Sequence, residues 1–129
     1  MTSGSCLCGA VTLTVEGEFE HQPEICHCRQ CRKQTGHYLA GVNVRKTQLR
    51  ISGKNLAWYR SSEKVERGFC RTCGSTLFWA PNMPDYEWLA VAMGLFDENT
   101  GLRLIKQTFV GDKGDYYDLP DGIPQSEAH

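Results

Sequence analysis

Hydrophobic and polar residues alternate in short stretches along this chain, a pattern typical of half-buried strands. Val11, Leu13 and Val15, for example, alternate with polar residues. Other short apolar stretches are separated by turn sequences such as Ser-Gly-Lys-Asn at residues 52–55. These predicted strands are residues 39–44, 49–51, 56–60, 65–69, 76–79 and 88–93, while residues 102–110 fit either a strand or a helix. The pattern therefore predicts a mostly β fold of small antiparallel sheets.

Two segments depart from this pattern. Residues 28–34 suit a short helix that stops at Thr35-Gly36, and this helix would place Cys28 and Cys31 on one face. The tail from about residue 111 contains several glycines and prolines and is expected to be irregular. No repeat or linker divides the chain, so residues 1–129 are expected to form a single domain.

Charge and hydropathy exclude several classes of partner. The formal net charge of -1 gives no electrostatic basis for binding nucleic acid or an anionic membrane. The longest uncharged apolar run, Trp88 to Phe96, is far shorter than the roughly 20 residues that span a bilayer. The first residues lack the basic and apolar regions of a signal peptide. We therefore expect a cytoplasmic protein with no membrane partner.

The cysteines are grouped in a way that suggests metal binding. They form a short pair, a triplet and a second short pair, at Cys6-x-Cys8, Cys26-x-Cys28-x-x-Cys31 and Cys70-x-x-Cys73. Disulfides do not persist in a reducing compartment, and an odd number of cysteines would leave one unpaired. The spacing therefore predicts two sites for a soft metal such as zinc.

The grouping of the cysteines decides which site is open. Cys70 and Cys73, followed by glycine between two predicted strands, resemble a zinc knuckle, and Cys6 and Cys8 would complete a closed structural site. The triplet would then leave one coordination position free. One alternative joins the triplet to a single outer cysteine. Another closes the triplet with a histidine, the candidates being His21, His27 and His37, although His27 should point away from the metal by strand alternation.

Three cations flank the triplet. Arg29, Arg32 and Lys33 would favour ionised thiols and could bind the carboxylates of a substrate. The simpler interpretation is that they form a solvated face. No general base is obvious, since His27 and His37 are the only candidates nearby.

A zinc ion held by Cys26, Cys28 and Cys31 predicts a particular chemistry. The zinc ion together with its three thiolates has a formal charge of -1, which makes it a weak Lewis acid toward a carbonyl. It can still bind a substrate thiol as thiolate. Such a thiolate can add to a small aldehyde or leave from its adduct, so we interpret these three cysteines as the catalytic centre.

These motifs resemble those of the glutathione-dependent formaldehyde-activating enzyme family, whose domain is shared with centromere protein V. The resemblance covers most of the chain, from Cys6-Leu7-Cys8-Gly9 through the cysteine triplet and the Phe69–Ser75 segment to residues 91–97 and 121–124. It implies an all-β fold called the β-tent. It further implies a structural zinc at Cys6, Cys8, Cys70 and Cys73 and a second zinc at the triplet. The implied reaction joins formaldehyde to glutathione, which is carbon–sulfur lyase chemistry in reverse.

A second function of another class stays open. The chain could be a non-catalytic, zinc-stabilised module that binds protein or nucleic acid. Nucleic-acid binding would call for a basic extension, which this sequence lacks. The sequence leaves the oligomeric state and the substrate open.

Overall fold

The computed structural model describes residues 1–129, and strands dominate it. The strands are β1 (Thr2–Ser5), β2 (Thr12–Val15), β3 (Glu24–Cys26), β4 (Leu39–Arg45), β5 (Leu49–Ser52), β6 (Leu56–Ser62), β7 (Val65–Cys70), β8 (Thr76–Pro81), β9 (Trp88–Ala92) and β10 (Lys106–Thr108). The helical elements are α1 (Arg29–Thr35) and the 3-10 turns η1 (Lys46–Gln48), η2 (Met93–Leu95) and η3 (Val110–Asp112). No helix is both long and apolar enough to span a membrane.

The strands form two sheets. The smaller one has the order β1-β2-β5 and the larger one the order β10-β3-β4-β9-β8-β7-β6. Every pair is antiparallel except β3 with β10, which run parallel. The mostly β prediction is thus confirmed, and residues 102–110 contribute the short strand β10. Strand β1 has the sequence Thr-Ser-Gly-Ser and therefore carries no hydrophobic pattern that would have predicted it.

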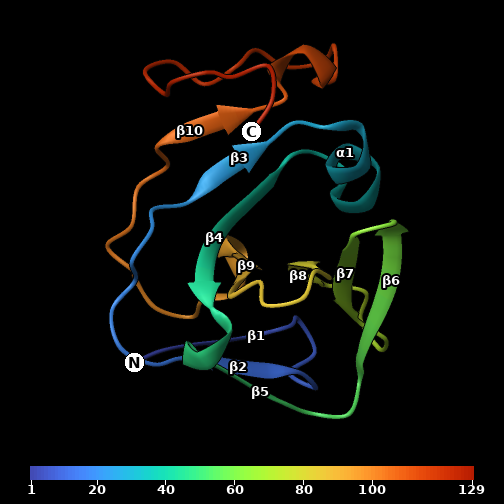
Figure 1. Ribbon diagram of the computed structural model, residues 1–129, viewed down its shortest axis with the longest axis vertical. Helices are drawn as coiled ribbons and strands as arrows, with labels where there is room; N and C mark the ends of the chain where they lie inside the picture. Colours follow the sequence, from blue (N-terminus) through green and yellow to red (C-terminus); the bar gives the residue numbers. More distant parts are fainter.

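The larger sheet is strongly curved (Figure 1). Strands β3 and β10 lie at one end of it and β6 and β7 at the other, with β1-β2-β5 below. Helix α1 follows β3 and lies beyond one end of β6 and β7. The C-terminal tail runs beside β10, because Gln107 N–H donates to Pro124 O at 2.8 Å and Ser126 N–H donates to Gln107 O at 2.8 Å. Residues of α1, β7 and the segment after β10 thus line one cleft.

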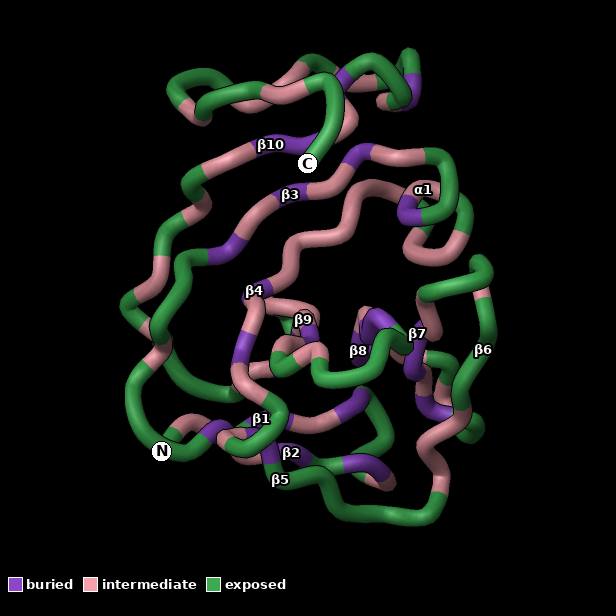
Figure 2. Tube along the Cα trace, viewed as in Figure 1, coloured by how far each residue is buried: buried purple, intermediate pink, exposed green.

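The hydrophobic core joins the smaller sheet to the larger one. Val11, Leu13 and Val15 are buried, as their alternation predicts. They belong to a cluster of buried residues that also contains Val42, Val44, Leu49, Leu77, Phe78, Ala80, Leu89, Val91 and Leu95. Figure 2 shows this distribution of buried segments beside exposed connecting loops. Cys6 and Cys70 are part of the same cluster, so one group of cysteines is continuous with the core.

Candidate metal centres

Four cysteines from the two outer pairs meet at the junction of the sheets. The sulfur atoms of Cys6, Cys8, Cys70 and Cys73 all lie within 4.8 Å of one another. Cys6 Sγ is 3.6 Å from Cys8 Sγ, which is 3.8 Å from Cys70 Sγ. Four sulfurs bound tetrahedrally to one zinc ion at about 2.3 Å would be separated by about 3.8 Å. The spacing in this cluster therefore fits a tetrahedral thiolate site.

Local backbone structure explains how each pair turns toward the metal position. Gly9 and Gly74 have φ of 80° and 78°, which only glycine adopts readily, and each closes the turn behind its cysteine pair. Val11 N–H donates to Cys6 Sγ at 3.3 Å, and Cys73 N–H donates to Cys70 Sγ at 3.5 Å. Burial alone would raise the pKa of Cys6, but the hydrogen bond from Val11 N–H and those from two neighbouring cysteines lower it, which favours the thiolate form that binds metal.

Ser75 joins the two loops. Its hydroxyl accepts from Leu7 N–H at 3.0 Å and lies 3.2 Å from Cys73 Sγ. Hydrogen bonds from the Ser75 side chain and backbone lower the pKa of Cys73 to about 5. The hydroxyl thus holds the first cysteine loop against the second while favouring thiolate at Cys73.

The other three cysteines form a separate cluster. Cys26 ends β3, Cys28 caps the N-terminus of α1, and Cys31 is in its first turn. Their sulfurs lie within 4.8 Å of one another, and Cys31 N–H donates to Cys28 Sγ at 3.4 Å. Hydrogen bonds from the side chains of Cys26 and Cys31 hold the pKa of Cys28 well below its usual range. The structure therefore divides the seven cysteines into groups of four and three.

Both clusters fit a soft metal ion. All seven thiols are free, so no disulfide competes for them. Zinc in proteins is held by four thiolates at closed sites and by three protein ligands at open ones. The four-cysteine cluster supplies a complete set of ligands, and the three-cysteine cluster lacks one.

The three-cysteine cluster forms part of the wall of a cleft of about 410 Å³. All three cysteines line it, so the incomplete ligand set faces a space that can admit a small molecule. The apolar part of the lining includes Leu39, Val65, Trp79, Ala90 and Phe109, and the charged part includes Glu24, Arg29, Arg67 and Asp112. A cleft with an apolar wall and a few polar groups is the usual form of a small-molecule site.

The three predicted substrate-binding cations occupy different positions. Arg29 lines the cleft, whereas Arg32 and Lys33 are not among its lining residues. Arg32 is half-buried, and its Nε atom is buried without a hydrogen-bond partner. Of these three residues, only Arg29 is placed to contact a ligand within the cleft.

Arg67 is a site residue that the sequence pattern did not reveal. It belongs to β7, is only 3% exposed, and lines the cleft. Its Nη1 donates to Cys31 Sγ at 3.4 Å and to Gln34 Oε1 at 3.1 Å. An arginine within a strand ordinarily faces solvent, so only its position ahead of Cys70 could have drawn attention to it.

The histidines near the triplet make contacts elsewhere. Gln107 Nε2 donates to two tail carbonyls, so Gln107 Oε1 must accept the proton of His27 Nε2 at 3.0 Å. His27 Nδ1 then accepts from the Tyr117 hydroxyl at 2.6 Å. Burial lowers the pKa of His27 and raises that of Tyr117, which matches a neutral imidazole and a protonated phenol. His27 thereby anchors the tail to the cysteine loop.

His37 is also bound to the tail, with its Nδ1 2.7 Å from the Tyr116 hydroxyl. The third candidate, His21, packs against Trp88 with their ring centroids 4.5 Å apart. No histidine belongs to either cluster of potential metal ligands. The arrangement therefore leaves the triplet without a histidine as fourth ligand.

Comparison with known proteins places this geometry in a wider group. The family model described as glutathione-dependent formaldehyde-activating enzyme matches residues 1–112. A Schizosaccharomyces pombe protein described as an uncharacterized lyase is 30% identical over 116 residues, covering 90% of this chain and 83% of the yeast protein. A crystal structure of a Rhodobacter sphaeroides protein is similar with a TM-score of 0.62 and 26% identity, covering 75% of this chain and 89% of the other.

Proposed function

This chain belongs to the glutathione-dependent formaldehyde-activating enzyme family, and we propose that it is a zinc-dependent carbon–sulfur lyase-type enzyme. Its substrates would be a small thiol such as glutathione, an aldehyde, and the adduct of the two. The family description supports the glutathione and formaldehyde chemistry, and the description of the yeast relative as a lyase supports the reaction class. Family membership alone leaves the substrate open, so the proposal depends on the site.

The observation that supports this function most is the position of the incomplete ligand set. Cys26, Cys28 and Cys31 lie in the wall of a cleft, whereas Cys6 and Cys70 of the other cluster are buried in the core. When bound by the three thiolates, zinc would supply a fourth coordination position that holds a substrate thiol in its thiolate form. A purely structural site would have no need of an open position facing a cleft.

Other residues of the cleft would bind and orient the reactants. Arg29 could pair with a carboxylate of a glutathione-like thiol, and its planar guanidinium suits this contact. Trp79 and Phe109 provide an apolar wall that would exclude water from the aldehyde. Arg32 and Lys33, which lie on α1, could contribute to the positive potential around the entrance.

The proposed reaction is balanced without an oxidant. In the direction of adduct formation, the thiol sulfur forms a bond to the carbonyl carbon, and the carbon–oxygen π pair moves to oxygen. The proton lost by the thiol ends on that oxygen, which gives a hydroxymethyl thioether from formaldehyde. In the reverse direction the carbon–sulfur bond breaks and the thiolate leaves.

The variant Cys28→Ser tests this proposal. A hydroxyl is a poor ligand for zinc compared with a thiolate, so the variant should lose the metal of the three-cysteine cluster. The four-cysteine cluster should keep its metal, and the fold should persist. Exchange between free formaldehyde and its glutathione adduct, followed by NMR, should fall at least a hundredfold, while circular dichroism stays unchanged.

Two results would contradict the proposal. A Cys28→Ser protein that has lost one metal but still catalyses exchange would remove the reaction from this cluster. A parent protein with both metals that neither binds glutathione nor catalyses exchange would favour a non-catalytic, zinc-stabilised binding module.

A further inference from the structure

Arg67 is a buried cation with no carboxylate partner. Its side chain is inside the molecule at 3% exposure, and the ion pairs of the structure involve only Arg45 and Arg50. Its guanidinium makes hydrogen bonds to three side-chain oxygens and one sulfur, which belong to Ser61 (3.1 Å), Gln30 (3.4 Å), Gln34 (3.1 Å) and Cys31 (3.4 Å). The oxygens are neutral, so Cys31 Sγ is the one acceptor that can carry a negative charge.

A buried charge of this kind is costly unless an opposite charge accompanies it. Three thiolates with one divalent metal ion have a net charge of -1, which the guanidinium would bring to zero. Arg67 comes from β7, far along the sheet from the cysteine loop, so the fold itself brings this cation to the cluster. Gln30 and Gln34 on α1 accept hydrogen bonds from the two Nη atoms and so orient the guanidinium toward Cys31.

We propose that Arg67 is the counter-cation of the three-cysteine centre and allows the metal there to accept an anionic fourth ligand. Adding a thiolate to the centre changes its net charge from -1 to -2, and in a partly buried cleft this change is unfavourable. When the charge of Arg67 beside Cys31 is included, the same step changes the net charge from zero to -1. Arg67 is thus a positioning residue for Cys31 and a determinant of ligand class, which favours thiolates over neutral ligands.

The inference rests on the same cysteine cluster as the proposed function but does not require the lyase reaction. It predicts a change in ligand preference, which a merely structural role for Arg67 would not produce. Removing the positive charge should weaken the binding of an anionic ligand and leave the binding of a neutral ligand nearly unchanged.

The experiment uses cobalt(II)-substituted protein, because the visible absorption of cobalt reports its fourth ligand directly. The parent, Arg67→Met and Arg67→Lys are titrated with 2-mercaptoethanol, which binds as an anionic thiolate, and with imidazole, which binds as a neutral ligand. Arg67→Met should bind 2-mercaptoethanol about tenfold or more weakly and imidazole within about threefold of the parent. Arg67→Lys keeps the charge and should recover most of the thiolate affinity.

Arg60→Met is a matched control, because Arg60 lies on the neighbouring strand β6, is exposed, and donates to Glu63 O rather than to a cysteine. It should change neither affinity. If Arg67→Met does not fold, Arg67→Gln serves as the neutral variant against Arg67→Lys. Equal weakening of both ligands, or no weakening of either, would overturn the role of Arg67. A protein that shows this ligand preference but no aldehyde exchange would instead overturn the proposed function alone.

Discussion

The backbone conformation of Phe109 is unfavourable for the stability of the fold. Its φ of 53° and ψ of 44° place it in the left-handed region, which bulky residues rarely occupy and which costs about 1–3 kcal/mol. The flanking backbone holds it there, because Thr108 O accepts from His27 N–H and Val110 N–H donates to Ser126 O. Its ring lines the cleft and packs edge-on against His129. The strained backbone at Phe109 therefore lies in the wall of the cleft beside the three cysteines.

Two variants of Phe109 separate this strain from the loss of the ring. Both Phe109→Ala and Phe109→Gly remove the ring, but only glycine relieves the left-handed backbone. The glycine variant should therefore be more stable than the alanine variant by about 1 kcal/mol, as measured by urea denaturation. At Phe19, where φ is not positive, the same pair of variants should show the opposite order. Greater stability of alanine at position 109 would show that the backbone there is not strained.

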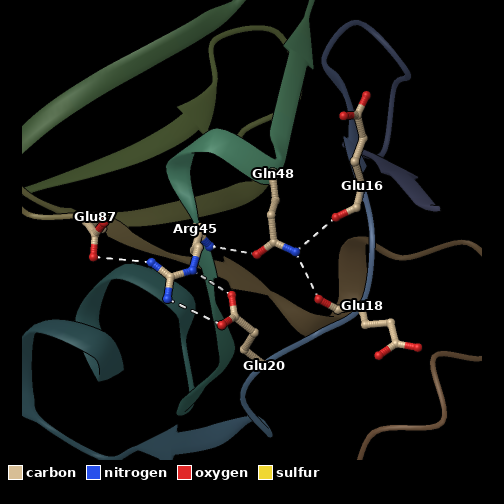
Figure 3. Close-up of polar contacts among 6 residues, drawn as sticks. All are labelled: Glu16, Glu18, Glu20, Arg45, Gln48 and Glu87. Carbon is tan, nitrogen blue, oxygen red and sulfur yellow. Dashed lines mark hydrogen bonds and ion pairs between the residues drawn. The ribbon is translucent and has the colours of Figure 1, made fainter.

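At the scale of elements, a polar network on the surface joins the end of β4 to the chain between β2 and β3. Arg45 Nε donates to Glu20 Oε2 at 2.6 Å, and Arg45 Nη1 lies 3.2 Å from Glu87 Oε2 (Figure 3). Gln48 Nε2 donates to the backbone oxygens of Glu16 and Glu18, both at 2.9 Å. These contacts hold the smaller sheet, and the chain between β2 and β3, against the larger sheet.

The network should make stability depend on pH in a defined window. The hydrogen bond from Arg45 lowers the pKa of Glu20 below its usual value of 4.5. The unfolded chain therefore binds the proton first, so this stabilisation is present above pH 4.5 and is lost as the pH falls through the lower, folded pKa. The difference in unfolding free energy between the parent and Glu20→Gln should shrink over that window. Both side chains are partly exposed to solvent, so added salt should also reduce this difference.

Glu98→Gln is the control for overall charge, because Glu98 is exposed and makes no ion pair. If Glu20→Gln and Glu98→Gln followed the same pH dependence, Arg45 would have no specific effect on Glu20.

At the scale of the whole molecule, the two cysteine clusters differ in what they connect. The four-cysteine cluster joins the loop after β1 to the turn between β7 and β8, so it connects the two sheets across more than 60 residues of sequence. The three-cysteine cluster lies within one short stretch, from the last residue of β3 to the first turn of α1. Closing a long loop restricts the unfolded chain more than closing a short one, so the first cluster should contribute more to folding.

Cys73→Ala tests this difference. Loss of a ligand from a cluster that joins the sheets should leave most of the protein unfolded or insoluble at 25 °C, because binding of a structural zinc contributes folding free energy directly. The comparison is Cys28→Ser, which removes a ligand from the local cluster and should remain folded. Thermal unfolding and metal content measure both effects. An unchanged melting temperature for Cys73→Ala would mean that this cluster does not stabilise the fold.

The sequence by itself determined the local features of this protein. Strict alternation, as at Val11, Leu13 and Val15, predicted strands because side chains on a strand alternate between its two faces. Close spacing of cysteines predicted metal ligands because thiolates a few residues apart can reach one ion. Strands β1 and β3 were missed, because Thr-Ser-Gly-Ser in β1 carries no hydrophobic alternation and β3 is only three residues long.

Only the tertiary structure decided which distant groups meet. Arg67 reads in the sequence as an ordinary strand residue, and its contact with Cys31 depends on how the larger sheet curves back toward α1. The same holds for Trp79, which reaches the cleft from β8, for Phe109, which reaches it from the residue after β10, and for Tyr117, which binds His27 across 90 residues. The compensation of charge and the shape of the cleft both depend on such long-range contacts. The spacing of residues along the sequence therefore does not predict them.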